Sequence, residues 1–384
     1  MGVFKRLLCG LIGFAAILTS VFLSACSRHG RTLYQSDAFR ISWLIEPGRY
    51  EDIRILSENY LALCKDEQAG VYLIADSTGK ILSKPLDACC LSEREQCILA
   101  VTRDNTYVFY ATDGTLLSDA AYQDAFPFQE GYAAVCANGK WGFIDRNGHE
   151  VLPMAYDGVA DGFSGGLAAV KQDGEWMYIR KDGTTAFACK FEAASMFSEG
   201  LAAVKENGKW GYVNTSGETV IECKFDAAHI FSEGLAAVCT SSDEGDIWQY
   251  LSTDGAVKFT VPYVDASDGR TEMVGEFKNG YALISSPLYC LIDCEGKTVL
   301  GEDSAFLTTF SEYDTRFGVI PAYIPAEADG TPGKKNGYVD IHGAEVLPFR
   351  FDYASPVAGQ IALVTEYDMA SQSVKVGIIT FIKT

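Results

Sequence analysis

The stretch FSEGLAAVKENGKWGY at 197–212 decides the fold, because the chain repeats it at a fixed interval. FSEGLAAV returns 34 residues later at 231–238, and the variant FSGGLAAV stands 34 residues earlier at 163–170. A period of 20–50 residues is typical of solenoids, propellers and other arrays that stack one small unit many times.

A turn glycine sets the register of the array. It recurs at Gly79, Gly114, Gly148, Gly183, Gly217, Gly255, Gly296 and Gly343. The residues seven places before these glycines form an almost wholly aromatic series: Tyr72, Tyr107, Trp141, Trp176, Trp210, Trp248, Tyr289 and Asn336. We expect this column to be core, since it follows the strand period. The register gives eight full units over about 55–354 and a truncated ninth.

Each unit of about 34 residues reads as three strands. In the clearest unit these are LAAVK at 201–205, WGYVN at 210–214 and TVIECKF at 219–225. Asn-Gly between the first two strands is a strong signal for a tight hairpin. The sequence therefore predicts an all-β protein of about eight or nine three-stranded units.

The Trp-Gly pairs at 141–142 and 210–211 make these units resemble the WG-repeat family. The resemblance covers most of the chain and is strongest over 126–238. It implies a β-repeat protein of the kind found in many bacterial lipoproteins, and it supplies no catalytic residues.

The two ends of the array complement each other. After SPVAGQIALV (355–364), VKVGIITF (374–381) takes the place of a second strand, and the unit then lacks its third. RISWLI (40–45) stands before the first unit as an orphan third strand. A β-propeller often closes in this way and leaves no open sheet edge. We therefore expect a propeller-like ring, with a β-solenoid as the alternative.

The N-terminus predicts export. Lys5 and Arg6 precede an uncharged apolar run over 7–22, and Leu23-Ser24-Ala25-Cys26 resembles the bacterial lipobox. We expect a lipoprotein signal peptide over 1–25, acyl chains such as palmitate on Cys26, a short tether over 26–40 and the repeat domain over 41–384. The protein would be anchored at the extracytoplasmic face of a bacterial membrane, with an ordinary signal peptide or a signal anchor as the alternative.

Charge and cysteine pattern exclude several classes of ligand. The net charge of −20 would repel nucleic acid. No C-x-x-C pair occurs, so neither a zinc site nor another cofactor is expected. Two pairs of cysteines occupy matching places in different units, Cys189 with Cys223 and Cys136 with Cys239, which favours buried thiols over disulfides. Local pairing stays open for Cys290 with Cys294, and among Cys89, Cys90 and Cys97.

Catalytic motifs are lacking. GFSGG at 162–166 matches G-x-S-x-G, but Ser164 is the repeat equivalent of Ser198 and no helix is expected after it. We therefore expect a non-enzymatic binding module for a protein, peptide or glycan partner. An enzyme acting on polysaccharide or cell-wall material and a structural spacer are the alternatives.

Three long hairpins mark a candidate binding face. They are TSSDEGDI (240–247), PAEADGTPGKKN (325–336) and EYDMASQS (366–373), and the register places all three on one side of the array. Insertions on one face of a repeat array commonly form its binding surface. The candidate residues are Asp243, Glu244, Asp246, Glu327, Asp329 and Asp368. Solvated acidic loops without a ligand are the alternative.

Overall fold

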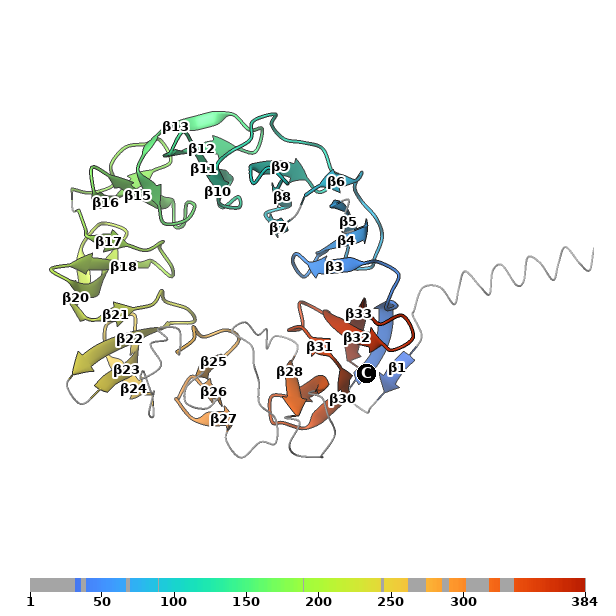
Figure 1. The fold of residues 1–384 in the computed structure, drawn as a ribbon. Coiled ribbons are helices and arrows are strands. Elements are labelled where there is room, and N and C mark those ends of the chain that lie inside the picture. The colour runs from blue at the N-terminus through green and yellow to red at the C-terminus, as the bar shows by residue number, and fades with distance from the viewer. Residues whose placement is uncertain are drawn as a thin grey trace, which may run out of the picture.

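The computed structural model describes residues 32–35, 39–66, 70–88, 90–188, 190–242, 245–261, 274–284, 290–301, 318–324 and 335–383. Within these ranges all regular secondary structure is β-strand, and the strands form nine antiparallel sheets. The sheets follow one another around a closed ring (Figure 1). The protein is thus a nine-bladed β-propeller, as predicted, and the solenoid alternative was wrong.

We number the blades in chain order, and the strands of each blade run outward from the centre of the ring. Blade 1 contains β3 (Asp52–Ile55), β4 (Tyr60–Asp66), β5 (Val71–Asp76) and β6 (Leu86–Asp87). Blade 2 contains β7 (Cys90–Arg94), β8 (Cys97–Val101) and β9 (Tyr107–Ala111). Blade 3 contains β10 (Asp124–Ala125), β11 (Tyr132–Ala137), β12 (Lys140–Asp145) and β13 (Glu150–Tyr156). Blade 4 contains β14 (Gly158–Val159), β15 (Leu167–Gln172) and β16 (Glu175–Arg180). Blade 5 contains β17 (Ala193–Ala194), β18 (Leu201–Glu206), β19 (Lys209–Asn214) and β20 (Thr219–Phe225). Blade 6 contains β21 (Ala227–Ala228), β22 (Leu235–Ser242), β23 (Gly245–Ser252) and β24 (Val257–Thr260). Blade 7 contains β25 (Tyr281–Ile284), β26 (Cys290–Asp293) and β27 (Thr298–Leu300). Blade 8 contains β28 (Val319–Ile324), β29 (Lys335–Asp340) and β30 (Glu345–Phe351). Blade 9 contains β31 (Tyr353–Ala354), β32 (Ile361–Asp368) and β33 (Ser373–Lys383), together with β1 (Thr32–Gln35) and β2 (Phe39–Ile45) from the other end of the chain.

The three-strand description of the unit needs one correction. Blades 3 to 6 and blade 9 have an additional, innermost strand of two residues, such as β17, in the segment that we predicted to be a connection. Ala193 and Ala194 pair with Lys205 and Val204 of β18. Two residues are too few to show the alternation of apolar and polar side chains by which a strand is recognised in a sequence.

The ring closes through its two ends, as the complementary fragments predicted. β2 pairs antiparallel with β33, with Ile41 opposite Phe381, and so supplies the third strand that the last unit lacks. β1 adds one further strand outside β2, with Thr32 opposite Ser42. The sheet therefore begins within the segment over 26–40 that we predicted to be a tether, because β2 offers an edge on which β1 can pair.

The alternating strand directions give the ring two distinct faces. In blade 5 the corner at 197–200 and the turn at 215–218 lie on one face, which we name the corner face. The β18–β19 hairpin at 207–208 and the connection from β20 to blade 6 lie on the opposite side, which we name the hairpin face. Each further blade repeats this arrangement where its connections are described.

The hydrophobic core lies between neighbouring blades. Phe197, at the corner of blade 5, is 1% exposed and packs against Tyr178 of blade 4, with ring centroids 4.8 Å apart. The Tyr178 hydroxyl donates a hydrogen bond to the Ser195 carbonyl, 2.8 Å away in blade 5. Equivalent ring contacts join other neighbouring blades: Phe143 with Phe163, Tyr212 with Phe231, and Tyr250 with Phe277. In these blades the first residue of the FSEG phrase therefore joins the blade to the one before it.

The described aromatic residues of the column are part of this core, as predicted, and Tyr289 lies outside the described residues. Tyr72 and Trp248 are buried, and Trp210 is half-buried against the core between blades 5 and 6. The glycine after Trp210 has a separate reason. A Cβ at Gly211 would lie 2.5 Å from the Ile221 carbonyl oxygen, so the close approach of β20 requires glycine in the Trp-Gly pair.

The cysteines of the described residues are all free thiols. This confirms the buried-thiol interpretation for Cys136 and Cys239, and it shows that Cys290 and Cys294 are not paired with each other. Burial raises the pKa of the Cys239 thiol to about 11, with a smaller contribution from Asp246. Such a thiol is an inert part of the core at neutral pH. Cys89 and Cys189 lie outside the described residues.

Candidate functional site

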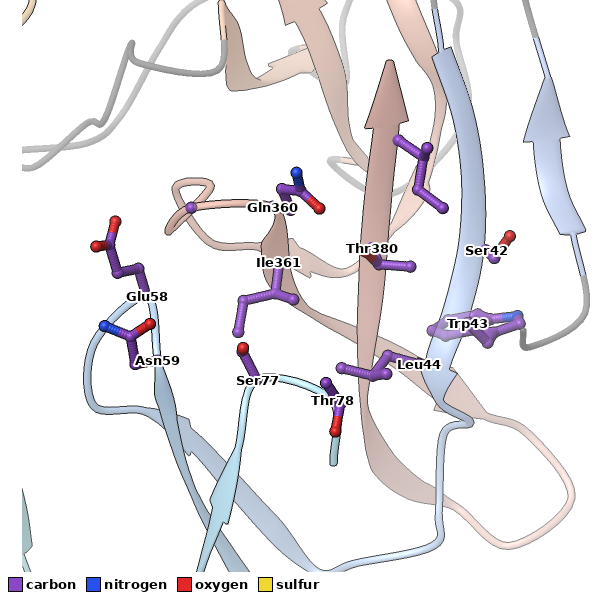
Figure 2. A pocket seen from close by; sticks show the side chains of 12 residues that line it. Ser42, Trp43, Leu44, Glu58, Asn59, Ser77, Thr78, Gln360, Ile361 and Thr380 are labelled. Carbon is purple, nitrogen blue, oxygen red and sulfur yellow. The ribbon is translucent and has the colours of Figure 1, made fainter. Parts of the chain in front are cut away.

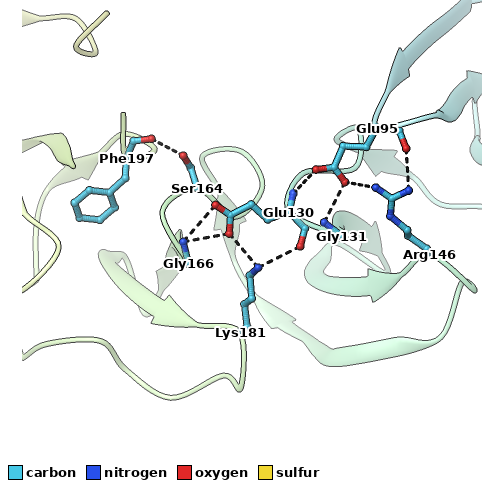
Figure 3. Close-up of polar contacts among 8 residues, drawn as sticks. All are labelled: Glu95, Glu130, Gly131, Arg146, Ser164, Gly166, Lys181 and Phe197. Carbon is cyan, nitrogen blue, oxygen red and sulfur yellow. Dashed lines mark hydrogen bonds and ion pairs between the residues drawn. The ribbon is translucent and has the colours of Figure 1, made fainter. Parts of the chain in front are cut away.

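The corner face is fastened by a carboxylate that reaches from one blade to the next. Glu130 of blade 3 accepts a hydrogen bond from the Gly166 amide of blade 4, 3.1 Å away, and forms a 3.0 Å ion pair with Lys181 (Figure 3). Glu199 accepts the Gly234 amide in the same way at 2.8 Å. The glutamate of the FSEG phrase is thus a fastening between blades, and we name this contact the corner clasp.

Glu95 makes the most extensive corner clasp. Its carboxylate accepts the amides of Glu130 and Gly131 at 2.7 and 3.1 Å and pairs with Arg146 at 2.7 Å (Figure 3). Burial would raise the pKa of Glu95, but the two amides and the guanidinium outweigh burial and hold that pKa below its usual value. The Glu95 carboxylate therefore stays ionised as part of the fold and does not act as a proton donor.

The serine of the phrase also fastens blades. Ser164 Oγ donates to the Phe197 carbonyl at 2.6 Å (Figure 3), and Ser198 and Ser232 repeat the contact with the carbonyls of Phe231 and Phe277. Ser164 is thus engaged in a corner, which agrees with the structural interpretation of GFSGG.

The hairpin face is fastened by an aspartate that follows the outermost strand. Asp226 forms a 2.5 Å ion pair with Lys209 of its own blade and accepts the Ser241 amide of the next blade at 2.9 Å. The ion pair to Lys209 and the amide from Ser241 hold the pKa of Asp226 below its usual value. Asp352 repeats the arrangement with Lys335 and the Tyr367 amide. Both acidic side chains therefore act as connectors between hairpins.

The predicted binding residues lie in several places. Asp243, Glu244, Glu327 and Asp329 lie outside the described residues. Asp246 lies in β23 of blade 6, and Asp368 ends β32 of blade 9. Counted from the innermost strand, both hairpins join the second and third strands of their blades, and so they project from the hairpin face, as predicted. Blades 7 and 8 stand between them, so the fold does not bring Asp246 and Asp368 together (Figure 1).

Asp368 is occupied by its own hairpin. Its carboxylate accepts hydrogen bonds from the Ala370 amide and the Ser371 hydroxyl, both at 2.9 Å, and pairs with Lys375. The Lys375 ammonium, followed by the Ala370 and Ser371 donors, holds the pKa of Asp368 well below its usual range. Asp368 therefore stabilises the β32–β33 hairpin, which also carries its neighbours Tyr367 and Met369.

Those neighbours are exposed and apolar. Tyr353, Tyr367 and Val374 are 43%, 46% and 57% exposed, and Met369 at the tip is 81% exposed. Tyr367 stands opposite Val374 in the hairpin, and Tyr353 stands opposite Thr365, two residues before Tyr367. The three strand residues therefore share one side of the sheet. We name these four residues the blade 9 apolar patch.

The acidic residues of the hairpins predicted a polar site, and the blade 9 apolar patch was not predicted. The signal was present in EYDMASQSV (366–374), where Tyr367, Met369 and Val374 alternate with polar residues. Such alternation is also the pattern of an ordinary half-buried strand, so only the packing shows which apolar side chains are left exposed.

Among the described residues, no group of three or more histidine, cysteine or acidic side chains is arranged to hold a metal ion. The described part of the chain contains no helix able to cross a membrane.

Comparison with known families matches the repeat register. The family described as "WG containing repeat" matches residues 109–141, 141–176, 176–210, 210–241 and 337–368. Three of the boundaries fall on Trp141, Trp176 and Trp210, the aromatic positions that set the register. No curated protein matches the chain.

Solved structures with a similar arrangement have little sequence in common with the chain. BamB from Moraxella catarrhalis is 11% identical, with a TM-score of 0.42 over 76% of this chain and 96% of that one. Dipeptidyl peptidase 4 from Porphyromonas gingivalis is 11% identical, with a TM-score of 0.45 over 86% and 57%. The computationally designed Ika8 protein is 14% identical, with a TM-score of 0.42 over 75% and 94%. By its strand topology the chain is a nine-bladed β-propeller, and five of its segments match the WG containing repeat family.

Proposed function

We propose that this protein is a non-enzymatic, lipid-anchored module that binds a protein or peptide partner through the hairpin face of blade 9. The observation that carries the proposal is the blade 9 apolar patch, where Tyr367, Met369 and Val374 of the projecting β32–β33 hairpin accompany Tyr353 of β31. Tyrosine and methionine are enriched where proteins meet. Clustered exposed apolar side chains are typical of interaction sites, whereas single ones are ordinary surface.

The hairpin is held ready for a partner. Asp352 receives the Tyr367 amide and pairs with Lys335 of blade 8, while Lys375 and Asp368 brace the tip. A hairpin whose backbone is already ordered loses less conformational entropy when a partner binds, so the same contact area gives a higher affinity.

The proposed anchor constrains where this blade would stand. Five residues lie between Cys26 and Thr32, the first residue of β1, so the two are six Cα–Cα steps apart. At about 3.3–3.6 Å per residue, a lipidated Cys26 would keep Thr32 within roughly 20 Å of the membrane surface. β1 is the outermost strand of blade 9 (Figure 1). Blade 9 would then be the blade nearest the membrane, which favours a partner in or on the same membrane.

A photo-cross-linking side chain at Met369 tests the binding surface. We expect one discrete cross-linked protein or peptide from intact cells, because Met369 is the most exposed apolar residue of the patch. The matched control carries the same group at Val220 on the outermost strand of blade 5, which is also exposed. Equal cross-linking from both positions, or none from Met369, would contradict the proposal.

The anchor is tested separately. We expect Cys26→Ser to abolish incorporation of an alkyne-labelled palmitate and to move the protein from the membrane fraction to the medium or periplasm. Unchanged labelling in Cys26→Ser would contradict lipidation at this residue and would leave the cross-linking result unaffected.

A further inference from the structure

The seam between blade 9 and blade 1 lacks the corner clasp. Where blades 5 and 6 have Phe-Ser-Glu-Gly, blade 9 has Val357-Ala358-Gly359-Gln360. The turn position that is Arg146 in blade 3 and Lys181 in blade 4 is Ser77 in blade 1. The clasp carboxylate, its serine and the cation are therefore all replaced at the seam where the ring closes.

A cavity of about 450 Å³ lies at this seam (Figure 2). Its walls come from both ends of the chain: Ser42, Trp43, Leu44, Glu58, Asn59, Ser77, Thr78, Gly359, Gln360, Ile361, Thr380 and Ile382. The volume falls within the roughly 300–1,000 Å³ that is typical of small-ligand sites. A Cβ at Gly359 would lie 3.0 Å from Glu58 Cβ, so the residue that replaces the clasp glutamate also keeps the two corners close together.

Several polar side chains line the cavity. Asn59 and Gln360 are exposed, and Ser77 and Thr380 are half-buried. Thr78 is already engaged, because its hydroxyl donates a hydrogen bond to Asp76 at 2.6 Å. The hydroxyl and amide groups of the other four side chains can bond to a ligand in exchange for water.

The remaining walls limit the chemistry of the ligand. Leu44 and Ile361 project toward one another and give an apolar side (Figure 2). Glu58 is the one charged residue that lines this cavity, and no lysine, arginine or histidine does. Phosphate, sulfate and carboxylate groups would therefore meet only a negative charge.

A second cavity continues the site across blade 1 on the corner face. It has a volume of about 760 Å³ and shares Glu58, Asn59, Ser77 and Thr78 with the first. Its far wall includes Tyr60, Leu82 and the corner of blade 2 at 93–96. Two adjoining cavities with shared walls suit a ligand made of several linked units.

We propose that the corner face over blade 1 binds a neutral oligosaccharide, with one pyranose ring in the cavity at the closing seam and the next units across blade 1. Hydroxyl and amide side chains match the hydroxyls of an uncharged sugar, and the Leu44–Ile361 wall matches the apolar C–H side of its ring. This site lies on the opposite face from the blade 9 apolar patch and stands independently of the proposed function.

Calorimetric titration of the purified full chain tests the site. The probes are cellotetraose, chitotetraose, maltotetraose and xylotetraose, with tri-lysine as the cationic comparison. We expect Ser77→Tyr to fill the first cavity and to weaken binding of whichever tetrasaccharide the wild type binds by at least about tenfold. The matched control is Thr215→Tyr at the equivalent turn of blade 5, which should leave the affinity unchanged.

The outcomes separate clearly. Saccharide binding that is lost in Ser77→Tyr and kept in Thr215→Tyr, with unchanged thermal unfolding in both, supports the proposal. It is overturned if none of the four tetrasaccharides binds, if Ser77→Tyr binds as tightly as wild type, or if only tri-lysine binds. Should Ser77→Tyr unfold, Gln360→Ala removes one amide from an exposed position and is expected to weaken binding several-fold.

Discussion

Replacing Ile41 by aspartate is expected to open the ring and to reduce the free energy of unfolding by about 4 kcal/mol or more. Ile41 is fully buried between blades 8 and 9 and stands opposite Phe381 in the closing strand pair. An aspartate there leaves a cavity and places an unpaired carboxylate among apolar side chains. Urea denaturation followed by tryptophan fluorescence measures the loss.

Hydrogen exchange distinguishes ring opening from general destabilisation. We expect the β33 amides that pair with β2 to lose protection in Ile41→Asp before those in blade 5 do, because closure depends on this one strand pair. The control is Arg40→Asp in the same strand, whose half-buried side chain should tolerate the change within about 1 kcal/mol. Full stability of Ile41→Asp would contradict closure by β2.

Replacing Phe197 by alanine is expected to cost about 3–5 kcal/mol, the usual range for removing a buried phenylalanine ring. Phe197 loses its contact with Tyr178, and its carbonyl, which accepts the Ser164 hydroxyl, is no longer held by the ring. The seam between blades 4 and 5 should therefore loosen first. Urea denaturation with limited proteolysis measures both effects.

The matched change is Val220→Ala on the outermost strand of blade 5, which is expected to alter stability by no more than about 0.5 kcal/mol. Similar losses in the two variants would show that the corner phenylalanine does not join the blades. Preferred cleavage in blade 1 or blade 2 would also argue against a role at this seam.

The sequence was sufficient for the architecture because its strongest signals repeat. The turn glycines and aromatic column gave the register, and RISWLI predicted a strand that now proves to pair with β33. The two-residue strand β17 and the corner clasp were not predicted. Glu199 looks like an ordinary polar residue of a turn, and its partner Gly234 is 35 residues away. Only the placement of neighbouring blades makes that pair visible.

The candidate sites were predicted less well for the same reason. Asp368 was identified by charge, whereas its contacts make it a support for the hairpin and leave Tyr367 and Met369 exposed. The cavity at the closing seam is formed by residues near both ends of the chain, such as Ser42 and Thr380. Nothing in either local sequence shows that they meet, since their proximity follows from ring closure.

The most direct test of the account measures the distance between blades 9 and 1. Spin labels at Gln360 and Lys80, introduced as unnatural amino acids to avoid the native thiols, lie on the corner face of neighbouring blades. With sheets about 10 Å apart, a closed ring predicts a single population at roughly 15–25 Å. An open array of nine sheets would separate the labels by about eight such spacings, near ~80 Å, and that result would contradict the ring.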